Sequence, residues 1–279
     1  MCQQIDLHLH TNCSDGSTAP EELLAMVRTM KLKAFSVTDH DTLQGYWKVR
    51  ELLVPGDPEL VSGLELSVTI DSSDVHLLAY LFDPSYAPLV NALNEFRQRR
   101  NQRGRLIVQK LNEMGIDISY QDVRATAGQA AIGRPHIAET MFRLKAVRTY
   151  EEAFEKYIRN GGPAYVPKKN FTPQEAVLAV HKAGGVAVLA HPILDDAYRY
   201  IEQLLPLGLD GIELYHPFHK QNDIDRLKQM AQQHRLLVSG GSDYHGREDR
   251  WYGTLGSQSV PVQCLDKLKE RAGETRGKH

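Results

Sequence analysis

Two histidines separated by one residue stand near the start of the chain, in the run IDLHLH at residues 5–10. The alternation of aliphatic and polar residues in this run predicts a β-strand, whose successive side chains point to opposite faces. His8 and His10 therefore share one face, and Asp15 follows in the next loop. Two imidazoles at positions i and i+2 of a strand can coordinate one metal ion, so this segment is a candidate metal site.

Further side chains that commonly bind metals stand at or near the ends of other predicted strands: His40, Glu65, His76, His191, Asp243 and His245. Taken singly, each has an ordinary structural explanation, as a strand cap or a hydrogen-bonded core residue. Taken together they do not, because clustered buried imidazoles and carboxylates need cations to offset their desolvation. These nine ligands exceed the roughly four to six that one ion takes, so two or three divalent ions sharing a carboxylate fit better.

A repeated pattern of short strands and helices must position these residues. Strands are predicted at 5–10, 34–38, 60–70, 75–82, 186–190, 211–214 and 236–239, and helices at about 20–30, 174–182, 198–205 and 222–233. Strands that alternate with helices indicate βα units and a mainly parallel sheet. The C-terminal ends of such strands are where α/β barrels place their active sites, and most of the candidate ligands fall there.

The middle of the chain has a different pattern. From about 89 to 157 it is helical and rich in Arg and Gln, with the basic run FRQRRNQRGR at 96–105. We therefore expect a discontinuous barrel formed by residues 1–90 and 170–272, and a helical insertion or cap at 91–169. The basic run is most simply a solvated helix face; the alternative is that it tracks an RNA backbone.

The composition excludes several classes of protein. Hydrophobic residues make up 42% of the 279 residues and charged residues 24%, as in a folded globular protein rather than a disordered chain. The 33 basic and 35 acidic residues give a net charge of −2, which provides no general attraction for nucleic acid. Three scattered cysteines encode neither a disulfide framework nor a CxxC zinc site. Without a signal-peptide pattern or an apolar stretch of about 20 residues, we expect a cytoplasmic protein with no membrane association.

Five ordered motifs resemble those of the PHP family, the polymerase and histidinol phosphatase family of metal-dependent phosphoesterases: HLHTNCSDGS (8–17), VTDHDT (37–42), GLELS (63–67), LAHP (189–192) and GSDYHG (241–246). The resemblance implies an α/β fold, a distorted (β/α)7 barrel with two or three metal ions at its mouth. Carried over by motif, it implies one ion held by His8, His10, Glu65 and Asp243, a second by Asp15, His40 and His245, and a third by His76, His191 and the bridging Glu65. Manganese is the expected metal, with iron, zinc and magnesium as alternatives.

Within this family the chain is most similar to the 3′,5′-nucleoside bisphosphate phosphatases and to RNase AM, a 5′-to-3′ exoribonuclease, on the segments GRPHIA (133–138) and YVPKK (165–169). Closely spaced divalent ions lower the pKa of a shared water and stabilise the oxygens that attack and leave. Our hypothesis is that a metal-bridging hydroxide attacks the 3′-phosphate of a nucleoside 3′,5′-bisphosphate, converting adenosine 3′,5′-bisphosphate to AMP and phosphate. The expected catalytic residues are Glu65, Asp243 and His216, the last as general acid or phosphate ligand. His216 and the nearby His219 can equally be loop histidines.

A second phosphate on the substrate requires a second anion site. Arg134 is the foremost candidate because its guanidinium fork matches phosphate geometry, although it can also be a surface residue stiffened by Pro135. Further candidate substrate-binding residues are His136, Lys168 and Asn12. The base can stack on Tyr165, Phe171 or Phe218, each of which can instead be a core residue.

Other activities stay open at this point. One is 5′-to-3′ trimming of short 5′-phosphorylated RNA, which uses the same attack on phosphorus with a ribose 3′-oxygen as leaving group. Another is hydrolysis of a C–N bond, as in amidohydrolases, although the abundance of cationic candidates favours a phosphate-bearing substrate. A metal-stabilised scaffold without activity predicts missing ligands, and none is missing in these motifs. The expected partner is a small nucleotide or a short single-stranded RNA, with no obligate protein partner.

Overall fold

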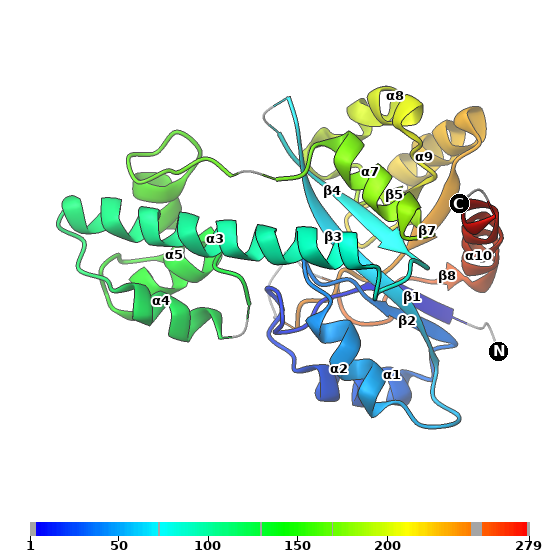
Figure 1. Cartoon of the computed structure of the whole chain (residues 1–279), viewed down its shortest axis with the longest axis horizontal. Helices are drawn as coiled ribbons and strands as arrows, with labels where there is room; N and C mark the ends of the chain where they lie inside the picture. Colours follow the sequence, from blue (N-terminus) through cyan, green and yellow to red (C-terminus); the bar gives the residue numbers. More distant parts are fainter. Residues whose placement is uncertain (1–3, 72, 129, 169, 247–252, 278–279) are drawn as a thin grey trace. The chain divides into compact units, whose positions relative to one another are not determined.

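The computed structural model describes residues 4–71, 73–128, 130–168, 170–246 and 253–277. The chain divides into two compact units, one made of residues 1–91 and 170–279 and the other of residues 92–169. The first unit contains a curved sheet with helices around it, and the second contains helices and loops (Figure 1). The chain thus leaves the first unit once and later returns to it.

In the part of the chain that the structure describes, the first unit is built on one sheet of eight strands. Their bounds are β1 Gln4–Leu9, β2 Ala34–Val37, β3 Glu59–Ile70, β4 Ser73–Tyr80, β5 Val186–Leu189, β6 Gly211–Tyr215, β7 Leu237–Gly240 and β8 Val260–Pro261. The strands follow the order β7-β6-β5-β4-β3-β2-β1-β8. The pairs β1–β2, β2–β3, β5–β6 and β6–β7 are parallel, whereas β3–β4, β4–β5 and β1–β8 are antiparallel.

The sheet closes on itself through the segment that follows β7. Leu9 at the end of β1 forms a parallel bridge with Tyr244, and the backbone N–H of His10 donates to the carbonyl oxygen of Tyr244 at 2.9 Å. Because this brings β1 beside β7, the strands β1–β7 form a nearly closed barrel, and the short β8 lies at its edge. The predicted α/β fold with a distorted barrel of the (β/α)7 type is confirmed.

Helices surround this barrel (Figure 1). Those of the first unit are α1 Pro20–Met30, α2 Gln44–Leu52, α7 Pro173–Lys182, α8 Ile201–Leu204, α9 Gln221–His234 and α10 Val262–Arg276. Local signals start them: Thr172, for example, caps α7 by accepting the backbone N–H of Glu175. Their apolar faces pack on the sheet, as where Val27 of α1 and Phe35 of β2 lie in one buried cluster.

One predicted helix has a different form in the structure. The helix predicted at 198–205 is instead a 3-10 helix, η2 (Leu194–Tyr200), followed by the single turn α8 and a second 3-10 turn, η3 (Leu205–Leu207). Asp196 adopts a left-handed φ of 54°, and Pro206 lacks the backbone N–H that a continuing α-helix requires. The last helix, α10, ends at Arg276.

The second unit has its own hydrophobic core. Its helices are α3 (Ala87–Glu113), of which the residues from 92 onward belong to this unit, α4 Tyr120–Ala127, α5 Arg134–Arg143, α6 Tyr150–Ala153 and the π-helix η1 (Phe154–Ile158). Ile107 and Leu111 of α3 are fully buried with Ile137 and Met141 of α5. These contacts join helices that are close in sequence, so the unit is held together largely by local packing.

The basic run at 96–105 lies on α3. Arg103 is buried, and its Nε donates to the carbonyl oxygen of Val166 at 2.6 Å. Arg105 places its guanidinium 3.8 Å from the ring centroid of Tyr120. Two arginines of the run therefore stabilise this unit itself. Neither α3 nor any other helix in the described part of the chain is both long and apolar enough to cross a membrane.

Candidate metal centre

The nine side chains that the motifs mark as metal ligands gather at one end of the barrel. His10, His40, His191 and Asp243 follow the C-terminal ends of β1, β2, β5 and β7, while Glu65 lies within β3 and His76 within β4. Since β1, β2, β5 and β7 run in the same direction, their C-terminal ends meet at the same edge. Every one of the nine is within ion-pair distance of at least one other.

Glu65 is the centre of this arrangement. Its side chain is 1% exposed, and its Oε2 lies 3.2 Å from Nε2 of His8 and 3.1 Å from Nε2 of His10. Oε2 also lies 3.3 Å from Nδ1 of His40. The other oxygen, Oε1, lies 3.0 Å from both Nδ1 of His76 and Nε2 of His191. One carboxylate thus faces five imidazoles from four strands or strand ends, which is the position of a bridging ligand.

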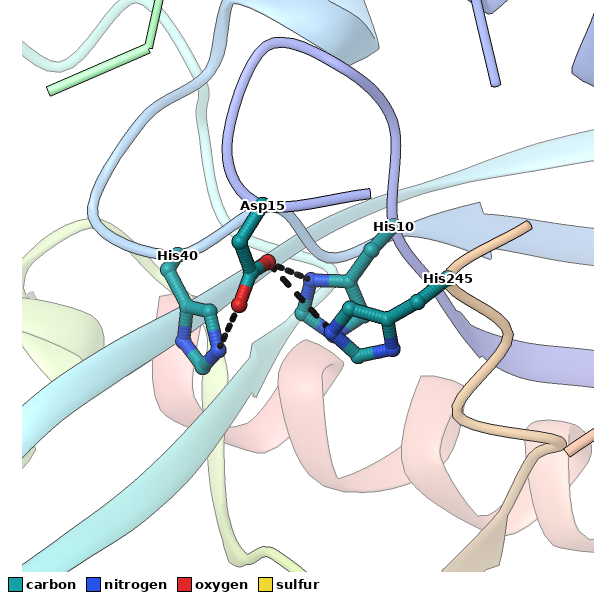
Figure 2. A group of neighbouring side chains, drawn as sticks. All are labelled: His10, Asp15, His40 and His245. Atoms are coloured by element: carbon teal, nitrogen blue, oxygen red, sulfur yellow. Dashed lines mark ion pairs between the residues drawn. The ribbon is translucent and has the colours of Figure 1, made fainter. Parts of the chain in front are cut away.

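A second group surrounds Asp15 (Figure 2). Asp15 Oδ1 lies 3.3 Å from Nε2 of His245 and 3.6 Å from Nδ1 of His10, and Oδ2 lies 3.6 Å from Nε2 of His40. The ligand atoms of these four residues all lie within 4.8 Å of one another. These separations are longer than direct hydrogen bonds, as expected where a cation can lie between the groups.

The third carboxylate of the cluster is Asp243. Its Oδ1 lies 3.2 Å from Nε2 of His8 and 3.4 Å from Nε2 of His10, so it joins the two histidines of β1. Its Oδ2 lies 3.3 Å from Nε2 of the buried His216. The backbone N–H of Phe218 donates to Nδ1 of His216 at 3.3 Å, so the proton of the neutral ring is on Nε2 and is directed at Asp243.

Strained backbone and buried hydrogen bonds hold the cluster in place. Asp243 and His191 have left-handed φ values of 50° and 26°, which residues other than glycine adopt only where the surroundings fix them. Asp39 fixes the loop that carries Asp15. Its carboxylate accepts the backbone N–H of Thr11 and the hydroxyl groups of Thr11 and Ser14, each at 2.7 Å.

The electrostatics of the cluster favour cations. Burial opposes ionisation of Glu65, Asp15 and Asp243, but the neighbouring imidazoles outweigh it and hold the pKa of each carboxyl well below its usual range. Burial also opposes the charged form of His10, yet hydrogen bonds to Asp243 and Glu65 raise its pKa to about 10. For His40 burial wins over Glu65 and Asp15 and lowers the pKa to about 3. The carboxylates therefore stay ionised, and His40 presents neutral nitrogens.

The residues fit divalent metal ions. Nδ1 of His40 is buried without a hydrogen-bond partner, although it lies 3.3 Å from Glu65. A metal ion would provide the partner that this nitrogen lacks. Among the described residues, three groups have ligand atoms close enough to hold an ion: His10, Asp15, His40 and His245; His8, His10 and Asp243; and His40, Glu65 and His76. The mixture of imidazole nitrogen and carboxylate oxygen suits first-row divalent ions.

The remaining predicted residues are not all at this cluster. Asn12 is exposed in the loop after β1, and its backbone N–H donates to the carbonyl oxygen of Thr18. His219 is buried, and its Nδ1–H donates to the carbonyl oxygen of Leu214 at 2.8 Å. Phe171 is also buried, in a bridge to Val68 of β3.

Arg134, His136 and Lys168 lie in the second unit. Arg134 begins α5, and its Nη1 donates to the side chain of Asn160 at 2.7 Å and to the carbonyl oxygen of Ile158 at 3.1 Å. Its guanidinium also lies 5.8 Å from the ring centroid of Tyr165. His136 accepts the backbone N–H of Gly133 on Nδ1, which places the proton of the neutral ring on Nε2. Lys168 is half-buried.

Two buried carboxylates beside the cluster, Asp6 and Glu213, lie inside strands, so a prediction based on polar residues at strand ends misses them. Glu213 accepts hydrogen bonds from His8 and from the backbone of His191. Asp6 accepts the backbone N–H groups of Ser242 and Gly256. The available signal was a charged residue inside an apolar predicted strand, in IDL at 5–7 and IEL at 212–214. Such a residue needs buried partners, and here most of the partners are metal-ligand candidates or their direct neighbours in sequence.

A nearly closed α/β barrel with imidazoles and carboxylates clustered at the C-terminal ends of its strands belongs to the class of metal-dependent barrel hydrolases. The family profile described as PHP domain matches residues 6–159. The chain therefore belongs to the PHP family, as its five motifs predict, and it is a hydrolase that acts on phosphate esters.

Three known proteins illustrate the similarity. The chain is 30% identical over 247 residues to the 5′-3′ exoribonuclease Rnm of Salmonella typhimurium, which covers 86% of this chain and 84% of that protein. It is 30% identical over 272 residues to a 3′,5′-nucleoside bisphosphate phosphatase of Chromobacterium violaceum, with 95% of each chain covered. A solved structure described as a metal-dependent phosphoesterase of Bifidobacterium adolescentis superposes with a TM-score of 0.84 and 29% identity over 96% of each chain. All three names describe chemistry on phosphate esters.

Proposed function

We propose that the enzyme removes the 3′-phosphate from nucleoside 3′,5′-bisphosphates and leaves a nucleoside 5′-monophosphate. The observation that carries the proposal is the single carboxylate of Glu65 at the centre of five imidazoles, beside Asp15 and Asp243. These donors suit closely spaced divalent ions, which stabilise both the attacking and the leaving oxygen when a phosphate group is transferred. The similarity to the Chromobacterium violaceum bisphosphatase along nearly the whole chain supports this substrate.

The proposed ligands are His8, His10, Asp15, His40, Glu65, His76, His191, Asp243 and His245. Divalent ions bound there, for which we propose Mn²⁺, supply a water of lowered pKa and neutralise charge on the phosphate oxygens. Glu65, Asp15 and Asp243 stay ionised and keep the imidazoles oriented. His216 holds a proton on Nε2, 3.3 Å from Asp243, and we assign to it the proton for the leaving 3′-oxygen.

We further propose that Arg134 binds the second phosphate of the substrate, with His136, Lys168 and Asn12 as additional polar contacts. Arg134 stands in the first turn of α5, where the helix dipole also favours an anion. The tautomer of His136, with its proton on Nε2, can donate to a phosphate oxygen. The guanidinium of Arg134 is partly engaged by Asn160, so its direction is fixed before an anion binds.

A second candidate activity is 5′-to-3′ trimming of short 5′-phosphorylated RNA, which the similarity to the Salmonella typhimurium exoribonuclease favours. Both reactions attack a phosphorus atom and release a ribose 3′-oxygen, so the same nine ligands serve either one. The two activities differ in the substrate: in RNA the chain continues beyond the attacked phosphate, whereas in a nucleoside bisphosphate that phosphate is terminal. Hydrolysis of a C–N bond needs no anion-binding arginine. The proposed anion-binding role of Arg134 therefore favours phosphate substrates over amides.

The deciding experiment is phosphate release from adenosine 3′,5′-bisphosphate in Mn²⁺, measured beside 3′-AMP and a 5′-phosphorylated RNA oligomer. We expect fast release from the bisphosphate and slow release from 3′-AMP. Arg134→Gln should raise KM for the bisphosphate about 10-fold, which is the loss of one charge-assisted bidentate contact. The exposed Arg148→Gln is the matched control.

Rapid shortening of the oligomer with slow turnover of the bisphosphate identifies the exoribonuclease instead. No turnover of any phosphate ester by the Mn²⁺-loaded enzyme, with activity on a panel of amides, overturns the proposal.

A further inference from the structure

Glu213, in the middle of β6, is a fully buried carboxylate with no exposed surface. Its two oxygens have different partners in the metal cluster. Oε1 lies 2.9 Å from Nδ1 of His8 on β1, and Oε2 accepts the backbone N–H of His191 after β5 at 2.8 Å. Glu213 is not one of the nine proposed ligands, so its contacts call for a separate explanation.

The contact with His8 determines which ring nitrogen can bind a metal. A carboxylate only accepts hydrogen bonds, so Nδ1 of His8 must carry the proton. In the neutral ring Nε2 then carries the lone pair, and it is Nε2 that lies 3.2 Å from Oε2 of Glu65 and 3.2 Å from Oδ1 of Asp243. Imidazoles that bind metals donate their other N–H to a carboxylate or carbonyl in this way, which fixes the ring orientation.

The contact with His191 acts on the backbone. His191 has a left-handed φ of 26°, a conformation that needs a compensating interaction. Its backbone N–H is held by Glu213, and in that conformation its Nε2 reaches Oε1 of Glu65 at 3.0 Å. The same carboxylate therefore controls one ligand through the ring and another through the main chain.

We propose that Glu213 is a positioning residue of the metal centre, which fixes the Nδ1–H tautomer of His8 and the backbone of His191 at once. It thereby couples two of the proposed ion positions, one that contains His8 and one that contains His191. The inference rests on the proposed metal-binding function of these histidines. It adds a residue that sets metal affinity without touching the metal.

The same strand offers a matched control. Asp210, directly before β6, is also buried, and its Oδ2 lies 2.7 Å from Nε2 of His181 and accepts the backbone N–H of Ala187 on β5 at 2.9 Å. Like Glu213, Asp210 contacts one imidazole and one backbone N–H, but it stands at the N-terminal end of β6. Asp210 makes no contact with the nine proposed ligands among its described hydrogen bonds.

The test is a titration of the metal-free variants Glu213→Gln and Asp210→Asn with Mn²⁺, read by the electron paramagnetic resonance signal of free and bound ion. An amide can accept one of the two hydrogen bonds but not both. We expect Glu213→Gln to weaken Mn²⁺ binding about 10- to 100-fold, the range found for residues that orient metal ligands. Asp210→Asn should lower the melting temperature and leave Mn²⁺ affinity within about twofold of wild type.

The outcomes separate the two proposals. Unchanged Mn²⁺ affinity in Glu213→Gln, or equal losses in both variants, overturns the positioning role while wild-type binding and activity stand. A wild-type protein that binds no Mn²⁺ overturns the proposed function itself. Glu213→Asp serves if Glu213→Gln does not fold: its shorter side chain cannot span both partners, so it should also weaken Mn²⁺ binding, and wild-type affinity in it overturns the inference.

Discussion

The carboxylate of Asp6 accepts the backbone N–H of Ser242 at 2.9 Å, across 236 residues of sequence. Its other oxygen accepts the backbone N–H of Gly256 at the same distance. Asp6 is 1% exposed and lies two residues before His8, while Ser242 directly precedes Asp243. One buried carboxylate on β1 thus connects the first strand of the barrel to the segment that follows its last strand, β7, beside the proposed metal ligands.

Asp6→Asn should destabilise the protein by about 1–3 kcal/mol, because the amide can accept only one of the two backbone N–H groups and leaves the other unpaired. Urea unfolding monitored by circular dichroism gives this free energy. Asp225→Asn, an exposed aspartate of α9, is the control and should change stability by less than about 0.5 kcal/mol. Equal stability of the two variants contradicts the role given to Asp6.

Gly241→Ala should be strongly destabilising. A Cβ at Gly241 would lie 2.4 Å from both the backbone nitrogen and the Cβ of His8, and neither atom can move without displacing β1. We expect a loss of about 3 kcal/mol or more. Gly273→Ala, where a Cβ meets nothing within 4 Å inside α10, should instead stabilise by about 0.5–1 kcal/mol. Thermal unfolding of both variants checks the opposite signs.

Glu65→Gln should reduce kcat/KM for phosphate release by more than about 100-fold, because a neutral amide cannot bridge two ions. The effect should exceed the loss of about 10- to 100-fold that is typical of residues that only orient a metal ligand. The number of Mn²⁺ ions retained per chain, measured by elemental analysis, should fall with it. Glu59→Gln is the control on the same strand, because Glu59 is exposed and pairs with Lys269. If Glu59→Gln loses as much activity, the effect belongs to β3 and not to the carboxylate.

Removal of metal should lower stability as well as activity. The cluster places the ionised carboxylates of Glu65 and Asp243 and several imidazoles in buried positions, beside the half-buried Asp15, and bound cations would offset the cost of this burial. Dialysis against EDTA should lower the melting temperature, and Mn²⁺ at about 100 times its Kd should restore about 2.7 kcal/mol. Differential scanning calorimetry measures both steps. A melting temperature that does not respond to Mn²⁺ argues against metal binding at this cluster.

Cys264 provides a pH-dependent prediction away from the site. Burial raises the pKa of its thiol from the ordinary 9.0 to about 11. At pH 8.5 the folded protein should therefore react with iodoacetamide at this residue roughly 100-fold more slowly than the unfolded chain. The unfolded thiol ionises first, so the contribution to stability is complete below about pH 9 and is lost as the pH rises towards 11. Peptide mass spectrometry follows the alkylation, and equal rates in folded and urea-unfolded protein contradict the burial.

The sequence predicts much of the barrel because its strands carry strong periodic signals. The alternation in residues 5–10 places His8 and His10 on one face, and the structure has their Nε2 atoms 3.1 Å apart. The two strands predicted at 60–70 and 75–82 correspond to β3 and β4, which the structure pairs antiparallel. The antiparallel β4–β5 pair is different, because the whole second unit separates these strands in sequence and no local pattern reports such a pairing.

The residues that support the site are harder to predict than those that form it. Glu213 and Asp6 act on the backbone of distant segments, and a backbone N–H leaves no mark in the sequence. The left-handed φ at Asp243 and His191 is likewise invisible, because neither residue is a glycine that would indicate it. Residue type and spacing therefore identify candidate ligands, whereas their orientation is decided by tertiary contacts.

The closure of the barrel by residues 241–246 also sets an order for events during synthesis. On the ribosome the second unit, with its own core, emerges before β5, β6 and β7 exist, so it can fold first. Asp243 and His245 emerge much later than His8 and His10, and Asp6 has no Ser242 to bind until then. A nascent chain therefore carries unpaired imidazoles and carboxylates for most of its synthesis, and the proposed metal centre is the last part of the molecule that can be loaded.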